Sequence, residues 1–149
     1  MKLSEWIDPT LHGNLIGGGT DAIRLCTSPD GWVEQFGVDT LISYKNEAAL
    51  ERLKIELSVW ALNVDFRFSR VFGRFLPKKN AERETPHLIT GDPDANLQSA
   101  VLERMLRYGI DFGAGYSVGF FIDQRENRRF VREIAPRNLL NCFAYTCSF

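Results

Sequence analysis

The sequence predicts an α+β protein, in which a small β-rich N-terminal region with one helix leads into the start of an α/β domain. Residues 22–44 contain short runs that alternate apolar and polar side chains, as strands do. Residues 46–62 carry apolar side chains at helical spacing. After residue 123, a charged helical stretch precedes an apolar run from Asn138 that is typical of a buried parallel strand.

The composition is that of a globular chain with one domain, or with one small domain and part of another. The chain has 149 residues, of which 44% are hydrophobic and 25% are charged. Its net charge of -1 gives no overall attraction to nucleic acid or to anionic membranes. Any contact with RNA must therefore come from a local patch.

The cysteines indicate a reducing compartment. Cys26, Cys142 and Cys147 are odd in number, have no C-x-x-C spacing and have no histidine cluster beside them. This pattern argues against a disulfide framework and against a metal site, and it predicts a cytoplasmic location. The first residues contain acids and Pro9 in place of an apolar segment, so they predict neither a signal peptide nor a membrane anchor.

The N-terminal residues 1–19 end in three glycines, which predict a flexible loop. A glycine triplet can also cradle a phosphate, but that site needs a preceding strand and a following helix with Lys or Ser/Thr in place. Neither is evident, so the loop is favoured. Residues 22–27 then predict a strand, residues 28–31 a turn through Pro29-Asp30-Gly31, and residues 32–44 further strands.

Residues 46–62 form the clearest predicted helix of the first half. Asn46 can cap it, and Glu47 suits its positive first turn. A helix that docks into a partner's groove would look the same, but packing onto its own core is favoured. The expected core positions are Ala49, Leu50, Leu53, Leu57 and Trp60.

Residues 64–76 predict a strand in which phenylalanines alternate with Arg67, Arg70 and Arg74. Such interleaving is used by proteins that bind single-stranded RNA. Plain alternation, with the rings in the core and the arginines in water, is the favoured interpretation. Residues 77–96 predict a long loop, which places a domain boundary near residue 95, between a domain of residues 1–95 and one of residues 96–149.

Residues 101–112 alternate again and predict a strand or hairpin that leads to Gly113. The apolar side chains on one face are Leu102, Leu106, Tyr108, Ile110 and Phe112, and the charged ones on the other are Glu103, Arg107 and Asp111. Further on, Asp123 and Glu126 have the spacing of a capping box, and Pro136 should end the helix that this box starts. On that helix, Asn127, Phe130, Val131 and Ile134 share one face, and Arg125, Arg128, Arg129 and Arg132 share the opposite one. The arginines predict a local positive patch.

Two blocks of this region resemble a known family. The first is G-F-F-x-D-Q-R-x-N-R over residues 119–128, and the second is L-x-N-x-F-A-Y-T over residues 139–146. In this order and spacing they resemble class I S-adenosylmethionine (SAM)-dependent methyltransferases related to bacterial large-subunit rRNA cytosine methyltransferases. The resemblance implies a Rossmann-like catalytic domain, SAM as cofactor, RNA and in particular rRNA as partner, and a β-rich front domain that helps to hold the RNA.

The resemblance also implies where the cofactor binds. A guanidinium there would pair with the methionine carboxylate of SAM. Three positions depart from the family pattern: Arg104-Met105 replaces a hairpin Asn-Gly, Ser117-Val118 replaces Lys-Thr, and Cys147-Ser148 replaces Gly-Gly. A nucleophilic Cys147 is disfavoured because no base is identifiable beside it. The residues expected to line the SAM site are Asp123, Gln124, Arg125, Asn127, Arg128, Phe143, Ala144, Tyr145 and Thr146.

The chain is expected to be the N-terminal portion of such an enzyme, ending after the first strand of the catalytic sheet. The catalytic residues would then lie beyond residue 149, and the chain alone should not methylate RNA. Two alternatives stay open at this point: a non-catalytic RNA-binding module and an inert remnant that does not fold stably. A homodimer is also left open.

Overall fold

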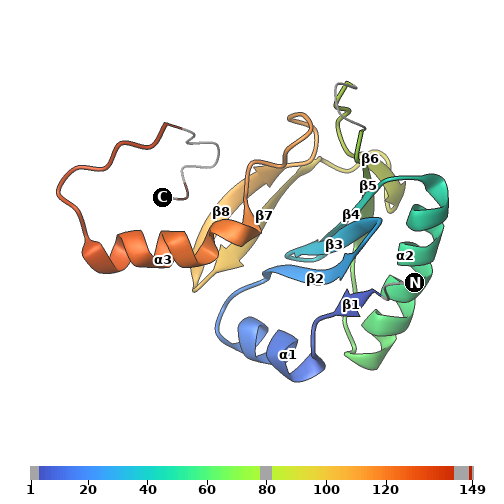
Figure 1. Ribbon diagram of the computed structural model, residues 1–149, viewed down its shortest axis with the longest axis horizontal. Helices are drawn as coiled ribbons and strands as arrows, with labels where there is room; N and C mark the ends of the chain where they lie inside the picture. Colours follow the sequence, from blue (N-terminus) through green and yellow to red (C-terminus); the bar gives the residue numbers. More distant parts are fainter. Residues whose placement is uncertain (1–3, 78–81, 143–147, 149) are drawn as a thin grey trace.

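The computed structural model describes residues 4–77, 82–142 and 148. Its centre is a sheet of six strands that follow one another in chain order (Figure 1). β4 and β5 are parallel, and the other neighbours are antiparallel. The strands are β1 (Glu5–Trp6), β2 (Ala22–Ser28), β3 (Gly31–Phe36), β4 (Asp39–Tyr44), β5 (Arg70–Phe75) and β6 (His87–Thr90).

One face of the sheet is covered by α2 (Glu47–Asn63), which connects the parallel strands β4 and β5. A parallel pair needs such a crossover, because its ends lie far apart. The predicted cap is confirmed, since the Asn46 side chain accepts a hydrogen bond from the Ala49 amide at 2.9 Å. The predicted core positions are confirmed as well, since all of these side chains are buried: Ala49, Leu50, Leu53, Leu57 and Trp60.

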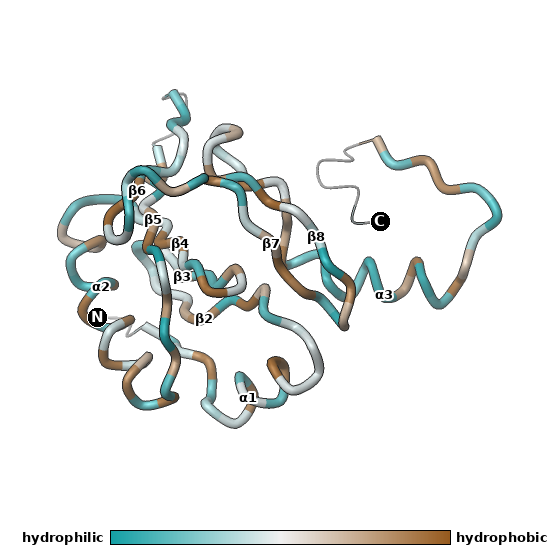
Figure 2. Tube along the Cα trace, turned by 180° about the vertical axis from the view of Figure 1, so that it is seen from behind, coloured by the Kyte–Doolittle hydropathy of each residue, from teal (hydrophilic) through white to brown (hydrophobic). Residues whose placement is uncertain are grey.

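The other face of the sheet is covered by a hairpin of β7 (Gln98–Glu103) and β8 (Leu106–Asp111). The molecule therefore has three layers, with the sheet between α2 and the hairpin (Figure 1). The rings of Phe72 and Phe112 stack at 4.0 Å between the second and third layers. In Figure 2, α3 (Arg125–Ile134) is largely hydrophilic and extends away from these layers.

The predicted N-terminal loop is wrong, because β1 and α1 (Pro9–Gly17) both lie within it. The Asp8 carboxylate caps this helix by accepting hydrogen bonds from the amides of Thr10 at 2.8 Å and Leu11 at 3.1 Å. Pro9 stands at the first helical position, where its missing N–H costs nothing. The pair Asp8-Pro9 signals the start of α1, and the glycine triplet of residues 17–19 marks only its end.

The strand predicted for residues 64–76 forms only from Arg70 onward, and β6 lies inside the predicted loop of residues 77–96. Nor are the strand's arginines in water. Arg70 pairs with Asp39 at 2.6 Å, and Arg74 donates to the Ser43 hydroxyl at 2.8 Å. The two arginine side chains are only 12% and 11% exposed. The prediction failed because this face of β5 is largely covered by the hairpin layer.

The hairpin turns at Arg104 and Met105, although neither residue favours positive φ. Their φ angles of 51° and 67° are those of a two-residue type I′ turn. The Met105 amide donates to the carbonyl of Gly19, and the Arg104 amide donates to the Thr20 hydroxyl, each at 3.0 Å. Contacts from the loop before β2 therefore hold a turn that the local sequence disfavours.

The predicted inward face of β7 is wrong. We expected Leu102 inside and Glu103 outside, whereas Val101 and Glu103 are buried at 1% and 0% exposure. The reason lies on the neighbouring helix, where an arginine meets the carboxylate of Glu103. On β8 the expectation holds for Ile110, which is buried, and fails for Leu106, which is 46% exposed.

The C-terminal part departs from the expected α/β unit. α3 ends at Ile134, ahead of Pro136 as predicted. Residues 138–142 form no strand, and Leu140 is 86% exposed. No described strand lies beside this segment to pair with it, and residues 143–147 lie outside the described part. The parallel Rossmann-like sheet is therefore not among the described residues. None of the described helices has the length and apolar character that a membrane crossing needs.

Candidate functional site

The first motif block, residues 119–128, runs along the hairpin and into α3. Phe120 and Ile122 are buried at 3% and 8% exposure in the cluster beneath the hairpin. Phe121 points outward and is 38% exposed. This alternation fixes the backbone immediately before the polar residues of the motif.

The predicted capping box is wrong. A single 3-10 turn, η1 (Ile122–Gln124), precedes α3, so Asp123 lies within the helical run and not ahead of it. No side chain caps α3. Glu126 pairs instead with Arg104 at 3.4 Å and with Arg129 at 2.9 Å.

The carboxylate of Glu103 is the centre of the site. Its two oxygens accept from Arg128 Nε at 2.8 Å and from Arg128 Nη2 at 2.6 Å, which is a bidentate pair. Both side chains are buried, with 0% and 1% exposure. Arg125 and Arg132 approach the same carboxylate to 3.6 and 3.5 Å. Three guanidiniums thus converge on one buried negative charge.

The charge of Glu103 offsets part of the local positive patch that the four arginines of α3 predict. Arg128 and Arg125 face the protein, and of the predicted apolar face Phe130 and Ile134 are 62% and 56% exposed. Arg129 and Arg132 are exposed, and Arg129 pairs with Glu133 on its own helix. The buried carboxylate of Glu103 reversed the orientation that the apolar spacing predicts.

The surroundings of Glu103 shift the pKa of Arg125. Burial lowers the pKa of the Arg125 guanidinium, and the neighbouring Arg128 adds to this, although the charge of Glu103 opposes both. Arg125 also donates to the carbonyl of Ala22, which ties α3 to β2. The ring of Phe120 lies 4.4 Å from the Arg128 guanidinium and offers it a cation–π contact.

The other motif residues form a polar row at the start of α3. Asn127 donates to the Gln124 side chain at 2.8 Å, and Gln124 approaches Asp123 at 3.4 Å. Asp123 and Asn127 are exposed. The structure thus brings Asp123, Gln124 and Asn127 together on one side and Arg125 and Arg128 on another. The predicted residues Phe143, Ala144, Tyr145 and Thr146 lie outside the described residues.

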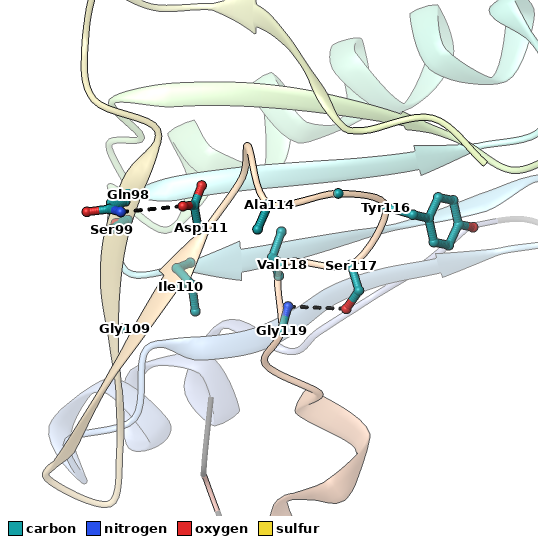
Figure 3. Close-up of a pocket in the computed structure, with 11 residues that line it drawn as sticks. Gln98, Ser99, Gly109, Ile110, Asp111, Ala114, Tyr116, Ser117, Val118 and Gly119 are labelled. Atoms are coloured by element: carbon teal, nitrogen blue, oxygen red, sulfur yellow. Dashed lines mark hydrogen bonds between the residues drawn. The ribbon is translucent and has the colours of Figure 1, made fainter. Parts of the chain in front are cut away.

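A hollow of about 630 Å³ lies immediately ahead of the motif, between the hairpin and residues 114–119. Figure 3 shows its walls, with Ile110 and Val118 as apolar surface and Asp111 and Ser117 as polar groups. The Ser117 hydroxyl accepts from the Gly119 amide at 3.1 Å and so shapes the turn into the motif. This volume suits a small organic ligand or one nucleotide.

Sequence reasoning missed Glu103. Its signal was available, because Val101 and Glu103 share a strand face and four arginines follow on α3. Buried carboxylates need a paired charge, so an acid on an apolar strand face predicts an arginine opposite. No group of His, Cys, Asp and Glu within the described ranges could hold a metal ion.

The comparison with known families decides the assignment. A model of the S-adenosylmethionine-dependent methyltransferase family matches residues 30–149. The chain belongs to this methyltransferase family. It is 33% identical over 156 aligned positions to ribosomal RNA large subunit methyltransferase I of Erwinia tasmaniensis, an alignment that covers all of this chain and 37% of that protein.

Other relatives agree with this methyltransferase assignment. The protein of the same description from Pseudoalteromonas atlantica is 32% identical over 99 residues, which are 63% of this chain and 24% of that one. A Streptococcus mutans structure described as a candidate SAM-dependent methyltransferase superposes with a TM-score of 0.60 at 20% identity, covering 82% of this chain and 32% of that one. A methyltransferase candidate crystallised with S-adenosylhomocysteine superposes with a TM-score of 0.61. In these alignments the chain spans between 24% and 37% of the length of its relatives.

Proposed function

We propose that this chain takes part in SAM-dependent methyl transfer to large-subunit ribosomal RNA, in the cytoplasm. The observation that carries the proposal is the 33% identity over the whole chain to a ribosomal RNA methyltransferase. The family membership supports SAM as the methyl donor.

The polar row at the start of α3 is the proposed edge of the SAM site. Asp123 is exposed and carries a carboxylate that can accept from an ammonium group, such as that of the methionine part of SAM. Gln124 and Asn127 add amide groups beside it. Arg125 and Arg128 belong to the proposed site as well, with Arg128 acting through Glu103 as a positioning residue. Phe143, Ala144, Tyr145 and Thr146 complete the proposed set.

The proposal divides the work between two parts. Residues 1–95 would help to hold the RNA, and residues 96–149 would form the front of the catalytic domain. We also propose that the 149 residues do not transfer methyl groups by themselves. In open α/β sheets the ligand lies beyond the carboxyl ends of parallel strands, and the described residues include only one parallel pair, β4 and β5. A homodimer remains a further proposal.

The function can be tested in cells that carry the gene. Deleting the gene should remove one methyl group from large-subunit rRNA, as read by mass spectrometry of nuclease digests, and the wild-type gene should restore it. Asp123→Asn should fail to restore the methyl group, because it removes the proposed acceptor of the cofactor's ammonium. Glu126→Gln is the matched control, because Glu126 is also an exposed acid, lies three residues further on in α3, and should leave methylation intact when changed.

Two outcomes would count against the proposal. Unchanged rRNA methylation after deletion would contradict the function itself. Full restoration by Asp123→Asn, at the same protein level as wild type, would contradict the proposed SAM site while leaving the function standing.

A further inference from the structure

A second hollow, of about 600 Å³, lies on the hairpin side of the sheet. Five side chains of its lining form what we name the arginine–aromatic pocket: Arg24, Trp32, Arg74, Arg83 and Tyr116. Its wall continues to Asp123 in η1, so the pocket borders the turn that leads into α3. The proposed rRNA methyltransferase function gives the polar row of α3 a role, and leaves this hollow without any.

Strand register gathers the pocket residues on one face of the sheet. Arg24 on β2 is opposite Glu34 on β3, and Trp32 on β3 is opposite Ser43 on β4. Ser43 in turn is level with Arg74 on β5. Because side chains alternate between faces, Trp32 and Glu34 point to the same side, and the ladder carries Arg24 and Arg74 to it. The result is a polar stripe across four strands.

Guanidinium and aromatic planes lie close together in this pocket. The Arg24 guanidinium lies 5.0 Å from the Trp32 ring, and that of Arg74 lies 5.8 Å from it. Arg74 and Arg83 lie 5.3 and 5.2 Å from the Tyr116 ring. Trp32 and Tyr116 are only half-buried, so part of each ring faces the hollow. Aromatic rings and guanidinium planes are the surfaces on which unpaired bases stack.

The charge of the pocket favours an anion. Glu34 is shared between Arg24 at 2.9 Å and Arg74 at 3.3 Å, so one carboxylate faces two guanidiniums. Asp123 stands at the rim and is exposed. Arg83 makes no ion pair with any described residue, and its guanidinium lies against the Tyr116 ring. The lining therefore keeps a net positive charge on a chain whose total charge is -1.

We infer that the arginine–aromatic pocket binds one unpaired nucleotide of a single-stranded RNA segment. The base stacks against Tyr116, and Arg83 faces the phosphate backbone. Trp32 and Arg74 form the floor, fixed by Glu34 and Ser43. The inference rests on the proposed function, because that function names RNA as the substrate class. It adds the place where the β-rich part holds the RNA.

The test is fluorescence anisotropy of a labelled 12-nucleotide single-stranded RNA titrated with the 149-residue chain. Tyr116→Ala should weaken binding by about five- to a hundred-fold, the range reported for loss of one stacked base. Tyr116→Phe keeps the ring and should bind like wild type. Arg83→Gln should weaken binding and reduce the salt slope by about 0.7, the value for one phosphate contact on a single strand. Arg107→Gln removes an equal charge from exposed β8 and is the control.

The outcomes separate this inference from the proposed function. Weakening by Tyr116→Ala and Arg83→Gln alone supports the pocket. RNA binding that all four variants leave unchanged, or equal affinity for duplex RNA, overturns the pocket and leaves the methyltransferase proposal intact. Absence of any RNA binding by the folded wild-type chain overturns the pocket as well. The deletion experiment on rRNA methylation decides the proposed function independently.

Discussion

At the scale of single residues, the site depends on one buried acid. Glu103 neutralises Arg128 within the protein and lies near Arg125 and Arg132. A buried ion pair adds little net stability, but an unpaired buried charge is costly. We therefore regard Glu103 as the residue that fixes the orientation of α3 and hence of the polar row at its start.

Replacing Glu103 tests this role. Glu103→Gln should lower the free energy of unfolding by about 3–5 kcal/mol, because Arg128 would remain buried without its counter-charge. Glu126→Gln makes the same chemical change at an exposed pair, whose side chains are 42% and 63% exposed for Arg104 and Glu126, and should cost about 1 kcal/mol or less. Urea unfolding followed by circular dichroism measures both. Equal losses from the two variants would show that the buried pair does not fix the helix.

At the scale of elements, the hairpin of β7 and β8 has a turn that its sequence disfavours and a register that places Glu103 on the buried face. Arg104 and Met105 adopt positive φ, which costs a non-glycine residue about 1–2 kcal/mol. The hydrogen bonds that the two turn amides donate to the Gly19 carbonyl and the Thr20 hydroxyl hold the turn in place. The register in turn sets Glu103 opposite Leu106 and on the inner face.

The turn offers a second stability test. Replacing Arg104-Met105 with Asn-Gly should raise the free energy of unfolding by about 1 kcal/mol, since these residues suit a type I′ turn and the greater freedom of glycine in the unfolded chain offsets part of the gain. Met105→Ala, which removes the side chain but keeps the unfavourable φ, should not stabilise the protein. Thermal unfolding of the two variants checks this. Stabilisation by Met105→Ala alone would assign the cost to the side chain instead.

Local patterns predicted some elements and missed others for physical reasons. The alternation of residues 22–44 and the helical spacing of residues 46–62 predicted β2, β3, β4 and α2, because burial of one face dominates those segments. α1 was missed because Asp8-Pro9 was given less weight than the glycines after it. β6 and the inward arginines of β5 and α3 depend on partners that lie far away in the sequence. No local pattern contains that information.

The candidate site, too, was predictable from the sequence only in part. The motif blocks located residues 123–128 from the sequence alone, and the structure adds how they are held. Glu103 lies outside both motif blocks, and its only local signal is its place beside Val101 on one strand face. Trp32 and Tyr116 carry no motif, so only the folded arrangement brings them together in the arginine–aromatic pocket. The assignment of Asp123 and Gln124 to SAM stays a prediction until the cofactor is bound.

At the scale of the whole molecule, three layers place two hollows on either side of residues 116–118. One hollow lies between the hairpin and residues 114–119, and the other is the arginine–aromatic pocket. The lining of the first hollow ends at Gly119, shortly before the polar row of α3, and the lining of the second reaches Asp123 in that row. We therefore propose that the described part of the chain holds RNA and presents it toward a cofactor site that it only begins to form.

The proposal that this chain binds RNA but does not transfer a methyl group is tested most directly with tritiated SAM. The purified 149-residue chain is incubated with SAM and unmodified large-subunit rRNA, and two quantities are measured on the same sample: RNA retained on a filter and tritium incorporated into the RNA. We expect salt-sensitive RNA retention that does not need SAM, and no incorporation of tritium. Steady transfer of tritium to the rRNA by this chain alone would contradict the division, because a complete catalytic site would then lie within these residues.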